Sequence, residues 1–448
     1  MHTSTTSTVP LVSWTAAQLL DATQGYWLND QAPNTEIKRI LTDSRDAEAG
    51  DAFLALKGER FDAHAFITQV AEQGCQVAIV SQPIDAEICQ LVVPDTRLAL
   101  GQLGAYRRAQ NPQLKVIALT GSSGKTTTKE MLGSILSRIA PTLVTRGNLN
   151  NDLGVPVMLL ELRPEHQYAV MELGASHQGE IDYTSNLVQP LVAGIINIGT
   201  AHLGEFGGRD GICRAKSEIY AHIAPNGTSI VPAADDFADS IRQAVQTEQV
   251  LSFGAGGEIF ATEIELQAQS ATFKLNTPQG VRQVNLPFAG EHNVQNATAA
   301  AAFALAIGIS LDDIVLGLEQ AVGAKGRLNF IQQGHHLLID DTYNANPTSM
   351  RAAAEVLAQQ EGVRVMVMGD IGELGSSAAQ QHYMLGRDLV SVKGLNFVVA
   401  VGEFAPAAQE GARSTQYGKK MQAFLTQEQA LPFLLSLIET HQPQPMSF

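Results

Sequence analysis

The chain has little of what marks a secreted, metal-clustered or nucleic-acid-binding protein. Its 448 residues include only three cysteines, Cys75, Cys89 and Cys213, which are far apart and odd in number. They predict neither a disulfide framework nor a cysteine metal cluster, and they suit a reducing cytosol. Positive charge is also scarce, because 29 Lys and Arg stand against 45 Asp and Glu. An acidic surface repels phosphate backbones, so we expect no nucleic-acid partner.

Long hydrophobic runs are missing as well. No apolar stretch approaches the length of a membrane span, and the first ten residues have neither the basic nor the apolar segment of a signal peptide. We therefore expect a cytoplasmic protein with no membrane segment, and we expect it to act as a monomer.

Apolar runs alternate with helical spacing along most of the chain, which predicts an α/β fold with parallel sheets. A chain of 448 residues is too long for one ordinary core. We expect a small α/β unit at 1–92, a central parallel-sheet P-loop ATPase-like domain at 93–318 and a C-terminal Rossmann-like domain at 319–448. The candidate strands are 116–119, 168–173, 192–197, 229–231, 336–339, 363–368 and 397–401, and the candidate helices are 96–108, 129–138 and 293–307.

Residues 119–128 read L-T-G-S-S-G-K-T-T-T, between an apolar strand and a helical pattern. This context favours a phosphate-binding loop, in which glycines let the backbone approach a polyphosphate and helix N–H groups face the anion. Lys125 can neutralise the β- and γ-phosphates, and the Thr126 hydroxyl can ligate Mg²⁺. The spacing is shorter than the usual G-x-x-x-x-G-K-[ST], and the alternative is a plain glycine turn. The loop residues are Gly121, Ser122, Ser123, Gly124, Lys125, Thr126 and Thr127.

Three further residues are candidates for the active site. Two of them follow apolar strands, and the third lies on a predicted helix. Glu172 lies at a strand's carboxyl end, where ligands bind in open α/β sheets, although a Glu there is commonly a surface residue. His202 follows the strand that ends near residue 198, and alone it would be a capping or surface His. Lys216 is predicted on a helix, where by itself it would be an exposed Lys paired with a nearby Glu.

Four motifs in this order and spacing resemble the Mur ligases, ATP-dependent amide-forming enzymes of peptidoglycan synthesis that are related to folylpolyglutamate synthetase. They are G-S-S-G-K-T at 121–126, M-E-L-G-A-S-H-Q-G-E-I at 171–181, G-T-A-H-L-G-E-F-G at 199–207 and A-K-S-E-I at 215–219. Two more agree: G-E-H-N-V-Q-N at 290–296 is similar to the family's adenine-contacting segment, and K-G-R-L at 325–328 to its interdomain segment. The resemblance covers nearly the whole chain.

The resemblance implies ATP and two Mg²⁺ ions as cofactors. Asn293 and Asn296 would hold the adenine, Asp341 the ribose and Arg327 the phosphates. One Mg²⁺ would bind Thr126 and Glu172, and the second would use Glu172, His202 and Lys216. A cationic Lys cannot ligate Mg²⁺, so the resemblance implies a carbamylated Lys216. The implied catalytic set is Lys125, Glu172, His202, Lys216 and Arg327.

Within the family, two segments indicate the substrates. D-D-T-Y-N-A-N-P-T-S-M at 340–350 and G-N-L-N-N-D-L-G-V-P at 147–156 are similar to members that add D-alanyl-D-alanine to UDP-N-acetylmuramoyl-tripeptide. T-D-S-R at 42–45 and A-L-K-G-E-R-F-D-A-H at 55–64 resemble their uridine-nucleotide site; without the family they would be an Asx-type turn and a solvated turn. The third residue of the tripeptide stays open between meso-diaminopimelate and lysine. The implied substrate residues are Ser44, Arg45, Lys57, Gly58, Asn148, Asn150, Asn151, Tyr343, Asn344 and Asn346.

Two segments depart from the family. Relatives end in a strand, K-G-S-R and a last helix, whereas this chain ends at 445–448, so we expect an apparently truncated third domain that lacks a sheet edge. Pro232 stands where relatives usually carry Asn, and we expect no catalytic effect.

Three alternatives compete with this interpretation. The nearest is an amide ligase of the same superfamily with another acceptor. A P-loop kinase or GTPase is a second, but no N-K-x-D guanine motif is present. The third is a non-enzymatic nucleotide-binding partner of wall-synthesis enzymes, which the set of Lys125, Glu172, His202 and Lys216 argues against.

Overall fold

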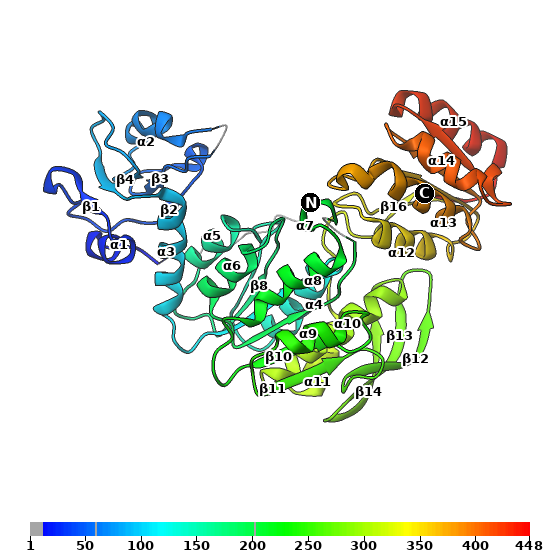
Figure 1. The fold of residues 1–448 in the computed structure, drawn as a ribbon, viewed down its shortest axis with the longest axis horizontal. Coiled ribbons are helices and arrows are strands. Elements are labelled where there is room, and N and C mark those ends of the chain that lie inside the picture. The colour runs from blue at the N-terminus through cyan, green and yellow to red at the C-terminus, as the bar shows by residue number, and fades with distance from the viewer. Residues whose placement is uncertain (1–11, 59–60, 201–202) are drawn as a thin grey trace. The chain divides into compact units, whose positions relative to one another are not determined.

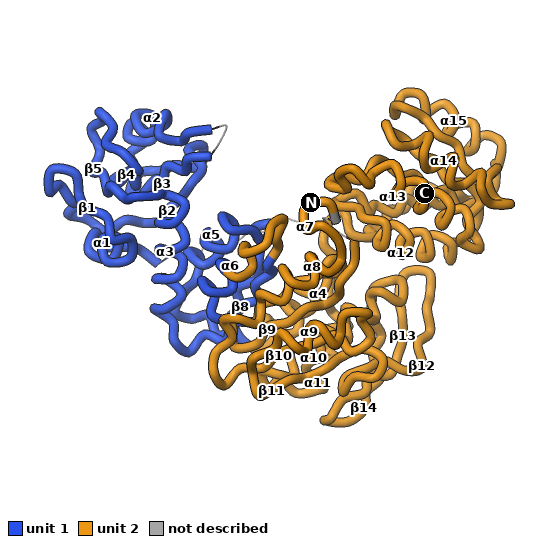
Figure 2. Tube along the Cα trace, in the orientation of Figure 1, with its two compact units in different colours: residues 1–116, 140–173, 183–189 blue, residues 117–139, 174–182, 190–448 orange. Residues whose placement is uncertain are grey.

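A computed structural model of the chain describes residues 12–58, 61–200 and 203–448 (Figure 1). It divides into two compact units (Figure 2), one formed by 1–116, 140–173 and 183–189 and the other by 117–139, 174–182 and 190–448. Among the described helices, none combines the length and the apolar character that crossing a membrane requires.

A five-stranded sheet organises the first unit, in the order β1-β5-β4-β3-β2. β1 is antiparallel to β5, and the other pairs are parallel. Successive strand residues face opposite sides, so Phe53 and Leu54 belong to different apolar clusters on the two faces. The strands are β1 (Tyr26–Trp27), β2 (Ile40–Leu41), β3 (Ala52–Leu54), β4 (Val77–Val80) and β5 (Cys89–Val92).

Helices and two further strands complete the first unit. β7 (Thr142–Val144) pairs in parallel with β8 (Tyr168–Glu172), which confirms the strand predicted at 168–173. The helix predicted at 96–108 is confirmed as α3 (Thr96–Ala109). The other helices are α1 (Ala16–Thr23), α2 (Ile67–Glu72) and α5 (Gly154–Leu160), with 3₁₀ turns at Leu28–Asp30, Ser44–Asp46 and Ala63–Phe66.

In the second unit, four strands run parallel in the order β11-β10-β9-β6. They are β6 (Lys115–Thr120), β9 (Val192–Ile195), β10 (Thr228–Pro232) and β11 (Gln249–Phe253). The long Ala-rich helix is confirmed as α10 (Glu291–Ala306), which lies beside α4. The other helices of this part of the chain are α4 (Lys125–Ser137), α7 (Leu203–Phe206), α8 (Arg209–Ser217), α9 (Ala238–Ala244) and α11 (Leu311–Glu319), with a 3₁₀ turn at Glu218–Tyr220. The residues of α6 (Glu180–Val188) are divided between the two units, with 183–188 in the first.

A three-stranded antiparallel sheet interrupts the alternation of strands and helices before α10. It consists of β12 (Phe260–Leu266), β13 (Ala271–Thr277) and β14 (Gly280–Leu286). The predicted parallel sheet of this part of the chain is confirmed, and the antiparallel sheet is an addition that the sequence analysis did not predict. The connection between β13 and β14 is a two-residue turn at 278–279, which joins antiparallel neighbours and cannot cross over to a parallel strand.

The last third of the chain forms a six-stranded sheet in the order β15-β16-β20-β17-β18-β19. Its β15–β16 pair is antiparallel and the other pairs are parallel, so the sheet is mixed and not the purely parallel sheet that a Rossmann-like domain implies. The strands are β15 (Asn329–Gln333), β16 (His336–Asp340), β17 (Val363–Met368), β18 (Phe397–Val401), β19 (Met421–Phe424) and β20 (Met446–Ser447). The helices are α12 (Pro347–Leu357), α13 (Ala378–Val390), α14 (Ala405–Arg413) and α15 (Gln427–His441), with 3₁₀ turns at Gly375–Ser377 and Gly418–Lys420.

The expectation that this sheet lacks an edge was wrong. Met446 and Ser447 form the short strand β20 between β16 and β17, in the middle of the sheet. Met446 is fully buried and pairs with Val363 of β17, and Ser447 pairs with Leu337 of β16, which holds the last residues of the chain in register.

Candidate active site

The predicted phosphate loop has the strand–turn–helix structure that its sequence indicates. β6 ends at Thr120, and α4 begins at Lys125 after Gly124, which adopts the left-handed φ of +79°. The Lys125 ammonium folds back over the loop and donates to the Gly121 carbonyl at 2.9 Å. The N-terminal backbone N–H groups of a helix are suited to bind an anion, so this is a workable phosphate cradle.

Asn197, which follows β9, holds the loop from the side. Its Oδ1 accepts hydrogen bonds from the backbone N–H groups of Ser122 at 3.1 Å and Ser123 at 2.9 Å. Its Nδ2 donates to the Ser123 carbonyl at 2.9 Å. The sequence analysis missed this residue, although it lies where the polypeptide leaves the carboxyl end of an apolar strand, a common position for site residues in α/β sheets.

A cavity of about 340 Å³ lies beside the loop. Seven of the predicted ATP-binding residues line it, namely Ser123, Gly124, Thr127, Asn293, Asn296, Arg327 and Asp341. Residues that were not predicted also line it, among them Asn197, Pro232, Phe253, Phe288, His292 and Thr348. The apolar members provide a surface for a flat ring, while the polar ones surround the phosphate loop, so the cavity suits a nucleotide.

Arg327 and Asp341 meet at one wall of this cavity. Asp341 accepts a hydrogen bond from the Leu328 N–H at 3.2 Å, and burial raises the pKa of its carboxyl group to about 6, although that N–H and the Arg327 charge oppose the shift. The Arg327 guanidinium lies 4.6 Å from the centre of the Tyr343 ring. Its Nε is buried and has no hydrogen-bond partner among the described residues, so a donor is available for an anion such as phosphate.

The two asparagines of α10 are buried and already bonded to protein. Asn296 Nδ2 donates to Asn293 Oδ1 at 3.0 Å, and Asn293 Nδ2 donates to the Ala289 carbonyl at 2.8 Å. Their neighbour His292 is neutral near pH 7, because burial lowers its pKa to about 4. The predicted adenine contact of Asn293 and Asn296 stays a prediction.

Of the proposed metal ligands, Glu172 and Lys216 are deeply buried, and Thr126 is partly buried. Glu172 is 1% exposed and accepts a hydrogen bond from Asn150 Nδ2 at 2.8 Å. Lys216 is 2% exposed on α8, so the alternative of an ordinary exposed Lys was wrong. His202 lies outside the described residues. Within the described part of the chain, no group of three or more His, Cys, Asp and Glu is placed to hold a metal ion, so both Mg²⁺ sites stay predictions.

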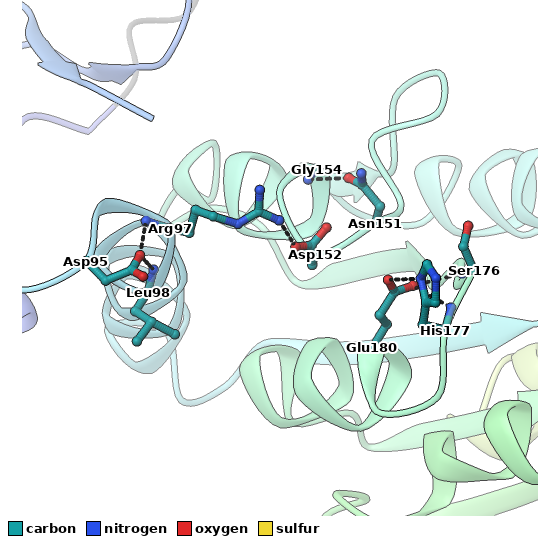
Figure 3. Close-up of polar contacts among 9 residues, drawn as sticks. All are labelled: Asp95, Arg97, Leu98, Asn151, Asp152, Gly154, Ser176, His177 and Glu180. Atoms are coloured by element: carbon teal, nitrogen blue, oxygen red, sulfur yellow. Dashed lines mark hydrogen bonds and ion pairs between the residues drawn. The ribbon is translucent and has the colours of Figure 1, made fainter. Parts of the chain in front are cut away.

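The segment that follows the Glu172 strand is tied together by Glu180 (Figure 3). Its Oε2 accepts hydrogen bonds from the backbone N–H groups of Ser176 at 2.8 Å and His177 at 3.2 Å. The His177 ring lies between two carboxylates, 3.3 Å from Glu180 Oε1 and 3.4 Å from Glu205 Oε2. The motif at 171–181 therefore forms a compact turn at the start of α6.

In the first unit, the predicted substrate loop at 148–151 is held by contacts at its C-terminal end. Asn151 Oδ1 accepts from the Gly154 N–H at 2.8 Å, and the next residue, Asp152, pairs with Arg97 at 2.5 Å (Figure 3). Asn150 contacts Glu172, as described above, whereas Asn148 is exposed. The loop is thus ordered by its own asparagines and by α3.

The segments predicted for the uridine nucleotide have the turn structures expected from their residues. Asp43 accepts from the Arg45 N–H at 3.0 Å, an Asx-type turn, and the Arg45 guanidinium lowers the pKa of Asp43 to about 2. Lys57 pairs with Asp62 at 3.8 Å, and the Gly58 N–H donates to the Phe61 carbonyl at 2.8 Å. A second cavity, of about 280 Å³ and within the first unit, includes Thr42 and Asp43 but not Ser44, Arg45, Lys57 or Gly58.

The segment that follows β16 is the one predicted to bind the acceptor, and it contains both exposed and buried residues. Tyr343 and Asn344 are exposed, and Asn344 Oδ1 accepts from the adjacent Ala345 N–H at 2.9 Å. Asn346 is buried, caps the N-terminus of α12 through the Ser349 N–H at 2.9 Å, and donates to Ser123 Oγ at 3.1 Å. The third-domain segment therefore reaches the phosphate loop.

Three family descriptions match the chain in succession. "Mur ligase family, catalytic domain" matches residues 36–118, "Mur ligase middle domain" matches 119–304, and "Mur ligase, glutamate ligase domain" matches 326–442. The chain thus has the three-domain α/β arrangement of these proteins, with a parallel-sheet ATPase domain in the middle and a mixed-sheet domain at the end.

Individual proteins are similar over most of their length. The UDP-N-acetylmuramoyl-tripeptide–D-alanyl-D-alanine ligase of Escherichia coli (strain K12) is 43% identical over 88% of this chain and 87% of the relative. The structure of UDP-N-acetylmuramoylalanyl-D-glutamyl-2,6-diaminopimelate–D-alanyl-D-alanyl ligase from Acinetobacter baumannii is 74% identical, with a TM-score of 0.90 over 99% of this chain and 96% of that chain. MurF ligase from Thermotoga maritima in complex with ADP has 25% identity and a TM-score of 0.79, over 91% and 92% of the chains. The chain therefore belongs to the Mur ligase family.

Proposed function

We propose that this protein is an ATP-dependent ligase that adds D-alanyl-D-alanine to UDP-N-acetylmuramoyl-tripeptide, the last cytoplasmic step of the peptidoglycan precursor pentapeptide. The observation that carries the proposal is the cavity in which the phosphate loop, Arg327 and Asp341 meet the start of α12. The similarity to the Escherichia coli ligase supports the choice of substrates. The 74% identical Acinetobacter protein supports diaminopimelate as the third residue of the peptide.

The reaction needs activation because a carboxylate is a poor acyl donor. A carboxylate oxygen of the tripeptide attacks the γ-phosphorus of ATP, the bond to the β–γ bridging oxygen breaks, and ADP leaves. The amine of D-alanyl-D-alanine then attacks the acyl phosphate carbon, the carbon–oxygen bond breaks, and inorganic phosphate leaves with the former carboxylate oxygen. Phosphoryl transfer depends mainly on positioning and charge neutralisation, which the protein supplies.

The residues that line the cavity and the adjacent phosphate loop divide these tasks. Lys125 and the N-terminus of α4 neutralise and orient the phosphates, and the buried Arg327 Nε donates to a phosphate oxygen. Asp341 accepts from the ribose, and Asn293 and Asn296 hold the adenine. An exposed acyl phosphate would be hydrolysed, so enclosing the site between loop and α12 protects the intermediate from water.

The metal-binding residues fit Mg²⁺ by their burial and chemistry. Glu172 offers oxygen ligands at 1% exposure, and a carbamylated Lys216 at 2% exposure would do the same, which suits a hard cation in a site shielded from water. When bound, Mg²⁺ would neutralise the negative charge that develops on the phosphates. Thr126 and Glu172 would hold one ion, and Glu172, His202 and the carbamate of Lys216 the other.

The remaining assignments follow from the family and extend this proposal. The domains are bounded at about 92 and 318, the protein acts as a cytoplasmic monomer, and the first domain holds the UDP moiety. The substrate residues are Ser44, Arg45, Lys57, Gly58, Asn148, Asn150, Asn151, Tyr343, Asn344 and Asn346.

The proposal is tested by measuring ADP release with UDP-N-acetylmuramoyl-tripeptide and ATP, with different acceptors. D-Alanyl-D-alanine should support release, and D-alanine or L-lysine alone should not. Comparable rates with a single amino acid would assign the protein to a sister ligase with another acceptor. Phosphate release that continues over many turnovers without any amine acceptor would instead favour the alternative of a P-loop kinase or GTPase.

A further inference from the structure

Ser123 of the phosphate loop is held on every polar atom by two asparagines. Its backbone N–H and carbonyl are bonded to Asn197, at 2.9 Å each. Its Oγ accepts a hydrogen bond from Asn346 Nδ2 at 3.1 Å. Asn197 belongs to the central domain, whereas Asn346 comes from the third-domain segment and lies 223 residues after Ser123 in the chain.

Asn346 itself is fixed before it reaches the loop. It is 9% exposed, and its Oδ1 caps α12 by accepting from the Ser349 N–H at 2.9 Å. The Ser349 hydroxyl in turn accepts from the Asn346 N–H at 3.1 Å, which completes a capping box. The amide plane is therefore set by the helix, and the direction of the Nδ2 donor follows from it.

This hydrogen bond has a consequence for the Ser123 hydroxyl. A serine hydroxyl has one O–H donor and two acceptor lone pairs. When Asn346 donates to one lone pair, the O–H of Ser123 points elsewhere, and Ser123 lines the cavity beside Gly124 and Arg327. The O–H is thus suited to donate to a phosphate oxygen of the bound nucleotide.

We propose that Asn346 is a positioning residue that orients the Ser123 hydroxyl toward the ATP phosphates. It thereby couples the position of the α12 N-terminus to the conformation of the phosphate loop. Nucleotide binding and the placement of the third domain then favour each other, because each orders the same serine. Thr348 and Ser349 of the same helix also line the cavity, so the α12 N-terminus and the loop form one wall. The inference rests on the proposed ATP site, and it assigns Asn346 to ATP binding in place of the substrate contact that the family resemblance implies for this residue.

A double-mutant cycle on Asn346 and Ser123 tests this coupling in the full-length protein. Asn346→Ser keeps a good N-cap residue for α12 but removes the Nδ2 donor, and Ser123→Ala removes the acceptor on the loop. Each should weaken ATP affinity by about 3- to 10-fold, as expected for one neutral hydrogen bond. The double variant should be no weaker than the worse single variant, because both remove the same interaction. The KM for D-alanyl-D-alanine should stay within about 2-fold of wild type.

A matched control separates this bond from general weakening of the third domain. Thr426 caps α15 through the Gln429 N–H at 3.4 Å and has no part in the cavity, so Thr426→Ala should leave ATP affinity unchanged. Independent, multiplying effects of Asn346→Ser and Ser123→Ala would overturn the inference. A raised acceptor KM in Asn346→Ser with normal ATP affinity would also overturn it and return Asn346 to the acceptor site. ATP binding that survives Lys125→Ala would overturn the proposed ATP site itself, whereas loss in Lys125→Ala with normal binding in Asn346→Ser would overturn only the coupling.

Discussion

The side chain of Asn296 lies directly against Gly124. A Cβ atom built on Gly124 would be 2.2 Å from Asn296 Oδ1, and Gly124 also adopts the left-handed φ of +79°. Position 124 therefore requires glycine for two independent reasons, the backbone conformation and the close approach of α10 to the phosphate loop.

Gly124→Ala should be more damaging than the same change at another left-handed glycine. The added methyl group incurs about 1–2 kcal/mol for the backbone conformation and a further ~1–3 kcal/mol for the clash. Gly308 is the matched control, since its φ is +86° and no atom lies within 4 Å of its Cβ position. Denaturant unfolding should show a clearly larger loss for Gly124→Ala, with ATP binding impaired only in that variant. Equal losses would contradict the packing described here.

Lys125→Ala should remove most of the ligase activity while the protein stays folded. Loss of a group that stabilises transition-state charge typically lowers kcat by about 10²-fold or more. Lys274→Ala removes a positive charge from the exposed Lys274–Glu263 pair and should leave activity within about 2-fold. Steady-state rates at saturating ATP measure both. Near-normal turnover in Lys125→Ala would show that 119–128 is only a glycine turn.

Lys216→Ala should be folded and able to bind ATP, yet nearly inactive. A carbamate on Lys216 would supply oxygen ligands, and short organic acids that enter the vacated space should partly restore activity. A readout independent of activity is the ¹³C NMR signal of a carbamate after incubation with labelled bicarbonate, expected in wild type and absent in Lys216→Ala. Wild-type activity in the variant, with no carbamate signal in either protein, would refute this role.

Stability should depend on pH through Asp341. Burial holds its folded pKa at about 6, above the ordinary 3.8, so the folded protein binds an extra proton between those values. The stability of the wild type relative to Asp341→Asn should therefore rise as pH falls from about 6 to 4, and fall as pH rises through about 6. Urea unfolding of both proteins at pH 4.5 and pH 7 measures this, and parallel pH profiles would contradict it.

Local sequence was sufficient to predict the phosphate loop and most of the strands around it. The apolar runs at 116–119, 336–339, 363–368 and 397–401 form β6, β16, β17 and β18, because the apolar residues that indicate a strand are consecutive in the sequence. The loop between β6 and α4 was predictable for the same reason: the two glycines and the Lys–Thr pair are adjacent in the chain.

The features of the fold and site that were not predicted depend on contacts between residues that are distant in sequence. Asn197 was missed because its role requires β9 to lie next to β6. Asn346 was predicted as a substrate residue, but its hydrogen bond to Ser123 could not be predicted, because it requires α12 to lie beside the phosphate loop. The burial of Lys216 could not be read from helical spacing alone, since burial depends on what packs over α8. β20 is only two residues long, too short for any periodicity to be recognised.

The most direct test of the proposed reaction follows an oxygen atom. UDP-N-acetylmuramoyl-tripeptide labelled with ¹⁸O in its reacting carboxylate is incubated with the protein, ATP and D-alanyl-D-alanine, and the released phosphate is analysed by mass spectrometry. An acyl phosphate pathway predicts one ¹⁸O atom in each phosphate formed from doubly labelled carboxylate, in step with the appearance of the pentapeptide product. Unlabelled phosphate would contradict the account, because the carboxylate would then not have been phosphorylated.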